Sequence, residues 1–178
     1  MQCKKALEEA GGDADKALII LKKKSGDIAA KKSDRELSGG VIQSYVHGAG
    51  SVGVLIELLC ETDFVAKNEE FKALAYDIAM HIAAMNPEFI RKEDITEDKV
   101  AKAKEIFEKE VDQSKPAEIR EKILQGKLDA YFADQILMEQ AFVKKPDTTI
   151  AGLISEGTQK FGEKIEVRRF VRYGLLQG

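Results

Sequence analysis

Two strongly patterned segments meet at Glu61-Thr62-Asp63-Phe64-Val65-Ala66-Lys67-Asn68. Before this octet, the apolar run from Val52 to Cys60 predicts a buried β-strand. After it, a helical pattern begins near Glu69, and Asn68 is a typical helix N-cap residue. The octet is therefore predicted to form a short strand-to-helix connection. Connections lie at the surface and carry function more often than the elements that they join.

Phe64 is the residue of the octet that this local geometry does not require. A turn or an N-cap needs small polar side chains, and Thr62, Asp63 and Asn68 supply them. Aromatic side chains are usually buried, so the residue pattern by itself favours a Phe64 ring folded back into the core. The other interpretation is a ring exposed for contact with a partner.

A β-hairpin is predicted before the octet. Val41 to Val46 is rich in strand-forming residues, and His47-Gly48-Ala49-Gly50-Ser51 is a turn sequence that would leave His47 exposed. On the returning strand, one face carries Val52, Val54, Ile56, Leu58 and Cys60. Gly48, Gly50 and Gly53 match the spacing of a dinucleotide-binding motif. That motif must open a helix, whereas these glycines open a strand, so we reject this interpretation.

Two short helices are predicted at the N-terminus, separated by Gly11-Gly12 and with Asp13 as the second N-cap. Such a pair buries too little surface to be stable alone, so a third element is expected to pack on it. Two Ser- and Gly-containing stretches, residues 25–27 and 38–40, are expected to bracket a flexible linker.

The remaining chain is predicted to be mainly helical. The expected elements are a helix over 69–86, one starting at Thr96, one over 114–126 with Gly126 as its stop, a helical continuation over 128–142, a turn at 144–147, a short helix capped by Thr148 or Thr149, and a closing strand over 165–173. Arg168, Arg169 and Arg172 on the closing strand suggest RNA binding, but a solvated sheet edge explains them better.

Composition narrows the classes of function. The 178 residues carry a formal net charge of −3, which argues against nucleic acid or an anionic membrane as the main partner. Cys3 and Cys60 make neither a disulfide framework nor a metal site, which favours a reducing cytosol. With two histidines and no nucleophile motif, we expect neither an enzyme nor a cofactor.

The octet, with the preceding Leu58-Leu59-Cys60, closely resembles the signature of the elongation factor Ts family. Further resemblance lies in Cys3-Lys4-Lys5-Ala6-Leu7, in Tyr45-Val46-His47-Gly48 and in the run from Pro116 to Val143. The resemblance covers essentially the whole chain. It implies an α+β fold with a small antiparallel sheet covered by helices.

The resemblance also implies a domain organisation. Residues 1–26 correspond to a ubiquitin-associated-like helical module without its first helix, 27–40 to a linker, and 41–178 to the core domain. A C-terminal module and a long helical-hairpin insertion of longer family members are expected to be absent. Because longer members carry two related core halves, we also expect this chain to form a homodimer.

The function implied by the resemblance is guanine-nucleotide exchange on elongation factor Tu in the cytoplasm or an organellar matrix. Thr62, Asp63, Phe64 and Val65 would contact elongation factor Tu and displace its Mg²⁺, with His47 and Lys4 as auxiliary contacts. The alternative is an adaptor that binds RNA or a ubiquitin-like protein, suggested by the N-terminal helices and the arginine strand.

Overall fold

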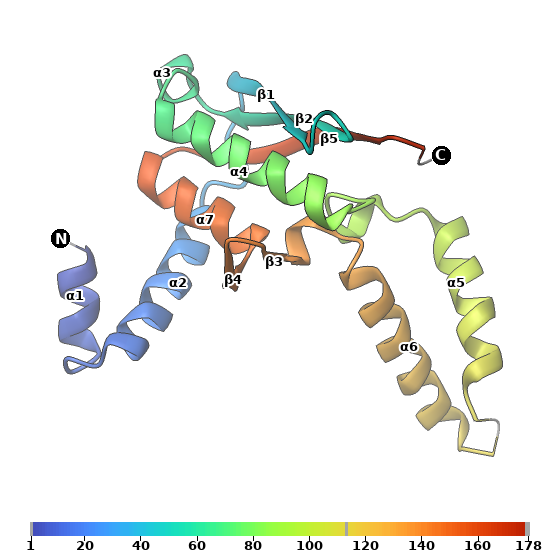
Figure 1. The fold of residues 1–178 in the computed structure, drawn as a ribbon. Helices are drawn as coiled ribbons and strands as arrows, with labels where there is room; N and C mark the ends of the chain where they lie inside the picture. Colours follow the sequence, from blue (N-terminus) through green and yellow to red (C-terminus); the bar gives the residue numbers. More distant parts are fainter. Residues whose placement is uncertain (1, 113, 177–178) are drawn as a thin grey trace.

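The computed structural model describes residues 2–112 and 114–176, and its fold is α+β as expected (Figure 1). The described elements are α1 (Gln2–Glu9), α2 (Ala14–Ala30), β1 (Gly39–His47), β2 (Val52–Cys60), α3 (Asp63–Ala66), α4 (Glu69–Met85), η1 (Lys92–Asp94), α5 (Glu97–Glu110), α6 (Ala117–Ala133), η2 (Leu137–Glu139), β3 (Ala141–Phe142), β4 (Lys145–Thr149), α7 (Ile150–Phe161) and β5 (Glu166–Gly174). Within these residues, no helix is both long and apolar enough to cross a membrane.

The main sheet has three antiparallel strands in the order β1-β2-β5. The predicted hairpin and closing strand are confirmed, and β2 is the central strand. Its side chains alternate, so that Val54, Ile56, Leu58 and Cys60 are buried on one face. Burial of this apolar face fixes the register, because a shift by one residue would expose the whole set.

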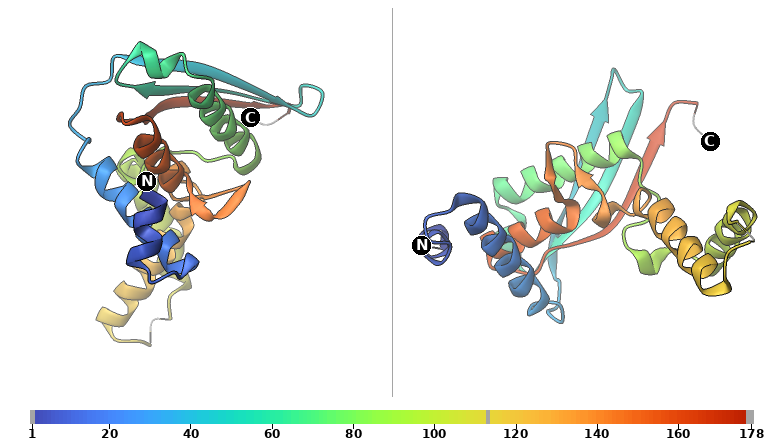
Figure 2. Two further views of the ribbon diagram at one scale, coloured as in Figure 1. Left: turned by 90° about the vertical axis from the view of Figure 1, so that its left-hand side faces the viewer. Right: turned by 90° about the horizontal axis from the view of Figure 1, so that it is seen from below.

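Helix α4 lies across the buried face of the sheet, with α7 beside it (Figures 1 and 2). The Asn68 side chain accepts a hydrogen bond from the backbone N–H of Glu70 at 2.8 Å, which confirms the predicted N-cap of α4. Thr149 caps α7 in the same way, accepting from Gly152 N–H at 3.1 Å. Side chains from β2, α4 and α7 form one apolar core.

Helix α2 packs on α7, on the side of α7 away from the sheet. It continues to Ala30, so the expectation that the helix ends near residue 26 is wrong. Ser25 is buried at this contact, where its hydroxyl bonds both to the Leu21 carbonyl and to the Gln159 side chain. The third element that packs against the N-terminal pair is therefore α7, and burial against it outweighs the turn-forming tendency of Ser25 and Gly26.

Helices α5 and α6 form an antiparallel hairpin that projects from the core (Figure 1). The helices predicted from Thr96 and over 114–126 are therefore both present, and they pack against each other. Gly126 lies inside α6 rather than at its end, because the flanking Leu124 and Leu128 pack into a second apolar cluster around Phe132. A glycine inside a helix costs about 1 kcal/mol, which such packing offsets.

The predicted helical continuation to residue 142 is also wrong. The chain leaves α6 at Ala133, and the backbone N–H groups of Leu137 and Met138 then bond to the carbonyls of Phe89 and Ile90 at 2.8 and 3.1 Å. The expected turn at 144–147 falls on residues 143 and 144, and β4 takes up 145–149. Leu137 is fully buried, and docking it into the core requires the chain to abandon the helix.

Candidate partner-binding site

The octet 61–68 connects the end of central strand β2 to α4 through the four-residue helix α3. Thr62 is the N-cap of α3, in an extended conformation, and its hydroxyl accepts from Val65 N–H at 3.4 Å. Lys67 ends α3, and Asn68 begins α4 at once. The predicted connection therefore contains a helical turn, which fixes the direction of every side chain in it.

Phe64 and Val65 are neighbours with opposite environments. The Phe64 side chain is 82% exposed, whereas Val65 is 4% exposed and belongs to the core cluster. The interpretation of Phe64 as a core residue is therefore wrong. The side chain of Val65, which was also expected to contact a partner, faces inward and anchors the helical turn that presents Phe64.

Glu163, in the connection between α7 and β5, holds the start of this turn. One carboxylate oxygen accepts from the backbone N–H groups of Glu61 and Thr62 at 3.1 and 3.0 Å. The other accepts from the Thr62 hydroxyl at 2.6 Å. The residue pattern gave no sign of this contact, because Glu163 lies about 100 residues away in the sequence and belongs to no motif.

The Glu61 side chain joins the same connection to the segment that precedes β1. Its carboxylate accepts from Lys164 N–H at 2.6 Å and pairs with the Arg35 guanidinium at 3.1 Å. Partial burial works to raise the pKa of Glu61, but the Lys164 hydrogen bond and Arg35 outweigh it, so the pKa lies below its ordinary value. The Ser38 hydroxyl also donates to the Glu61 carbonyl, at 2.5 Å.

Gly39 lies beneath the turn, at the start of β1. A Cβ atom at this position would lie 2.7 Å from the carbonyl carbon and oxygen of Thr62. Real side chains do not tolerate such an approach to backbone atoms, so Gly39 lets the turn cross over β1. The glycine was expected in a flexible linker, whereas it is buried at the start of β1.

The predicted auxiliary contacts lie far from Phe64. His47 pairs with Val52 at the opposite end of the hairpin, and eight residues of extended strand span ~26 Å. The ring of His47 is exposed, and its Nδ1 lies 2.8 Å from the Tyr45 hydroxyl. Lys4 is exposed on α1 and pairs loosely with Glu8 at 3.9 Å. The fold does not gather these residues into one pocket, and only a partner with an extended surface could touch them all.

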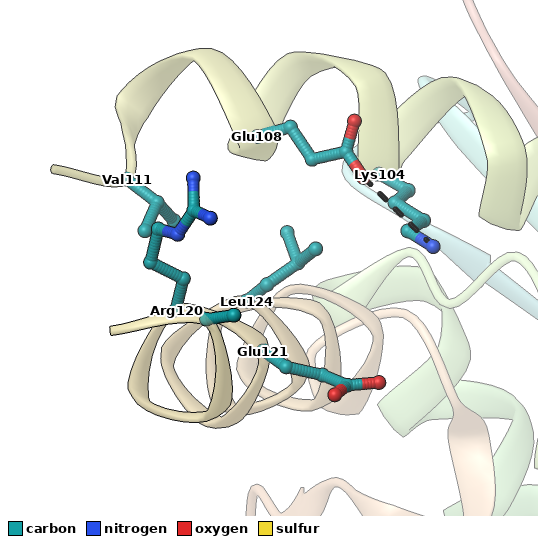
Figure 3. Close-up of a pocket in the computed structure, with 7 residues that line it drawn as sticks. Lys104, Glu108, Val111, Arg120, Glu121 and Leu124 are labelled. Carbon is teal, nitrogen blue, oxygen red and sulfur yellow. Dashed lines mark ion pairs between the residues drawn. The ribbon is translucent and has the colours of Figure 1, made fainter. Parts of the chain in front are cut away.

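Hollows in the surface do not suggest a small-molecule site next to Phe64. One, of about 410 Å³, lies between α5 and α6, and Figure 3 shows Leu124 pointing into it and the ion pair of Lys104 with Glu108 on its rim. Another, of about 480 Å³, lies beside the octet, where Asp63, Glu57 and Arg168 line it. Asp63 brings this second hollow next to the octet, but the residues that line it do not include Phe64.

Cys60, Arg169 and Arg172 each have a structural setting. Burial raises the pKa of the Cys60 thiol to about 11, so that it is not a nucleophile near neutral pH. Arg169 pairs with Glu57 at 2.6 Å, and Arg172 donates to the Ala83 carbonyl. In the described part of the chain, no group of three or more His, Cys, Asp or Glu side chains is placed to hold a metal ion.

Known proteins resemble this chain over nearly its whole length. The family model described as elongation factor TS matches residues 27–177. The elongation factor Ts of Desulforamulus reducens is 49% identical over 179 aligned positions, which cover 100% of this chain and 82% of that protein. The elongation factor Ts of Thermodesulfovibrio yellowstonii is 51% identical over 177 positions, which cover 99% and 88%. The chain therefore belongs to the elongation factor Ts family of translation elongation factors.

Proposed function

We propose that this protein is a guanine-nucleotide exchange factor in the cytoplasm, which binds elongation factor Tu and promotes the release of GDP. The observation that carries the proposal is the Phe64 ring, 82% exposed on a helical turn whose backbone is tied into the core. Together with Asp63, this ring would enter the nucleotide site of elongation factor Tu beside the bound Mg²⁺ and displace the ion.

Exchange of this kind needs no covalent chemistry on the chain itself. A protein that binds the nucleotide-free form of its partner more tightly than the GDP form must weaken GDP binding by the same coupling free energy. We accordingly propose that the chain hydrolyses no nucleotide and uses no cofactor of its own. The chain would contribute the side chains of Asp63 and Phe64, which compete with Mg²⁺ and phosphate for the same site on elongation factor Tu.

A rigid presentation of the ring favours this mechanism. An apolar side chain on a mobile loop would lose conformational freedom when it enters a partner, and this loss weakens binding. Here the Thr62 cap, buried Val65 and the immediate start of α4 leave the backbone of the turn little freedom. On binding, it is then mainly the exposed side chains of Asp63 and Phe64 that have to be ordered.

The direct test measures the release of a fluorescent GDP analogue from elongation factor Tu with increasing amounts of this protein. We expect release to accelerate and then saturate, and we expect the Phe64→Ala variant at the same folded concentration to be nearly inactive. An unchanged release rate at saturating protein would refute the proposal. Incubation of GTP with this protein alone checks that it does not hydrolyse nucleotide.

An adaptor that binds RNA remains the competing function, and one measurement separates the two. Binding that neutralises phosphates weakens steeply as salt rises, whereas a wedge of apolar contacts gives a shallow dependence. We expect the affinity for elongation factor Tu to change only about threefold between 50 and 200 mM salt, against the roughly thousandfold or greater loss typical of multiple phosphate contacts.

We further propose that two copies associate through the sheet face opposite α4. Ile42, Val46, Leu55, Val171 and Tyr173 are exposed there, and the charges of Glu57 and Arg169 on the same face pair with each other. An exposed apolar face of this kind is typical of an interaction surface. Light scattering at micromolar concentration should show a dimer that Leu55→Asp disrupts; monomer alone in the unmodified protein would contradict this proposal.

A further inference from the structure

Three segments far apart in the sequence meet at the start of α3. The octet supplies Glu61 and Thr62, the connection after α7 supplies Glu163 and Lys164, and the segment that leads into β1 supplies Arg35 and Ser38, with Gly39 as the first residue of β1. We propose that Glu163 is a positioning residue for exchange, which fixes the orientation of the turn so that Phe64 is presented in its binding-competent direction. This proposal rests on the proposed function of Phe64.

The geometry favours positioning over a general contribution to stability. Glu163 accepts three hydrogen bonds, and all three come from Glu61 and Thr62 rather than from the apolar core. Its partners immediately precede Asp63 and Phe64. A carboxylate that accepts backbone N–H bonds forms charge-assisted hydrogen bonds, which are stronger than neutral ones and are more sharply directed.

Each bond restrains a different freedom of the turn. The two N–H bonds fix the peptide planes on either side of Glu61, where the chain leaves β2. The third bond fixes the rotamer of the Thr62 hydroxyl, which in turn caps α3 through Val65 N–H. Without Glu163, the Thr62 hydroxyl would still accept from Val65 N–H but would lose the carboxylate that orients it. Because α3 is only four residues long, it has few other bonds to hold this orientation.

Glu61 links this arrangement to the N-terminal helices. Its side chain receives Lys164 N–H from the same connection and Arg35 from the segment after α2, while Lys164 Nζ donates to the Arg35 carbonyl at 3.3 Å. The turn is thus fixed from both sides, by the chain that enters the sheet and by the chain that closes it. The backbone of Gly39 lies directly against the Thr62 carbonyl group, so the turn cannot move closer to β1.

The test compares Glu163→Ala with Glu163→Gln and with the control Glu156→Ala. Glu156 is half-buried on α7 and pairs with Lys145 of β4 at 3.4 Å, away from the octet. We expect Glu163→Ala to lower the GDP-release rate at limiting concentration by about tenfold, since misplacement of a positioned group by ~1 Å has effects of this size or larger. Glu163→Gln keeps an acceptor oxygen and should recover most of the rate, and Glu156→Ala should leave it unchanged.

Two further measurements distinguish positioning from stability. Hydrogen exchange should be about tenfold faster at the Thr62 and Val65 amides of Glu163→Ala, with protection in β2 and α4 unchanged, as expected for local opening. In a double-mutant cycle, Glu163→Ala should lower release by less than about twofold when Phe64 is already Ala, because the two residues act as one unit.

The outcomes are separable from those of the proposed function. If Phe64→Ala exchanges GDP normally, the proposed function fails, and the amide exchange of Thr62 still decides whether Glu163 fixes the turn. If Glu163→Ala has normal amide exchange at Thr62, or lowers release equally with and without the Phe64 ring, the positioning role is refuted. An equal loss of protection across β2 and α4 would also refute it, since Glu163 would then support the whole fold.

Discussion

The α3 turn and the α1–α2 pair both expose large apolar side chains, but they do so on different supports. Phe64 projects from a turn held by backbone and side-chain hydrogen bonds on three sides. Leu18 and Ile19, 45% and 66% exposed, lie on a helix that packs on α7 along another face. Exposure of an apolar side chain alone does not identify a functional residue. Exposure on a backbone that hydrogen bonds hold in place is stronger evidence of a binding role.

The largest expected effect separates the ring of Phe64 from the core that carries it. Phe64→Ala should change the free energy of unfolding by less than about 0.5 kcal/mol, as for exposed positions, while nearly abolishing exchange. Leu58→Ala on the buried face of β2 should cost ~2–5 kcal/mol, and its folded fraction should exchange normally. Chemical denaturation and GDP release at matched folded concentration measure both quantities. If Phe64→Ala lowers the free energy of unfolding by several kcal/mol, the ring is part of the core and not an exposed contact.

A smaller effect is expected when the turn loses its cap. Thr62→Ala removes the hydroxyl that accepts from Val65 N–H and donates to Glu163, and it should cost about 1 kcal/mol. Thr62→Ser keeps the hydroxyl and serves as the control, with nearly unchanged stability. Denaturation midpoints compare the two variants. Equal stability of Ala and Ser at this position would show that the Thr62 hydroxyl does not help to hold the turn.

Acid should lower the stability of the core through the buried His81 of α4. Helices α1 and α2 contain no histidine. His81 is fully buried; its Nε2 lies 2.9 Å from the Gln140 side-chain oxygen, and its Nδ1 accepts from Val143 N–H at 3.3 Å. Burial lowers the pKa of His81 despite the opposing hydrogen bond to Gln140. Protonation would place a hydrogen on Nδ1, facing another donor.

The sign of the pH dependence follows from this lowered pKa. Below pH 6.5, His81 becomes protonated in the unfolded chain but stays neutral in the folded chain. Stability therefore falls as the pH decreases from 6.5 towards the folded-state pKa. One proton gives a slope of at most ~1.4 kcal/mol per pH unit. Denaturation at pH 7.5 and 5.5 measures it, with His81→Gln as the control. An identical slope in that variant would assign the effect to other groups.

The smallest effect is expected on the exposed face of α2. Ile19→Ser should change stability by less than about 0.5 kcal/mol, because most of its side chain already faces water. Ala17→Glu, two residues earlier on the same helix, should destabilise the pair, since Ala17 is buried. Helix content by circular dichroism and thermal melting compare them. A large loss in Ile19→Ser would mean that this face is covered in solution.

Local patterns in the sequence determined much of the fold. The period-two alternation of β2 predicted its buried face, because strand burial depends on residues close together in the chain. Asp13, Asn68 and the pair Thr148-Thr149 predicted three helix starts, since N-capping is equally local; the structure selects Thr149 of the pair. The signature around Phe64 pointed to the family, and the comparisons confirmed it. Its residues alone left the ring free to be buried or exposed.

Tertiary structure decided what depended on distant segments. Ser25 and Gly126 read locally as helix ends, yet packing on α7 and on the Phe132 cluster keeps both inside helices. Val65 turned inward and Phe64 outward because Thr62 capped a helical turn at that register. Glu163 reached this turn from about 100 residues away, and Gly39 made room for it. Capping and alternation are local and can be read from neighbours, whereas burial and long-range hydrogen bonds exist only once the chain has folded.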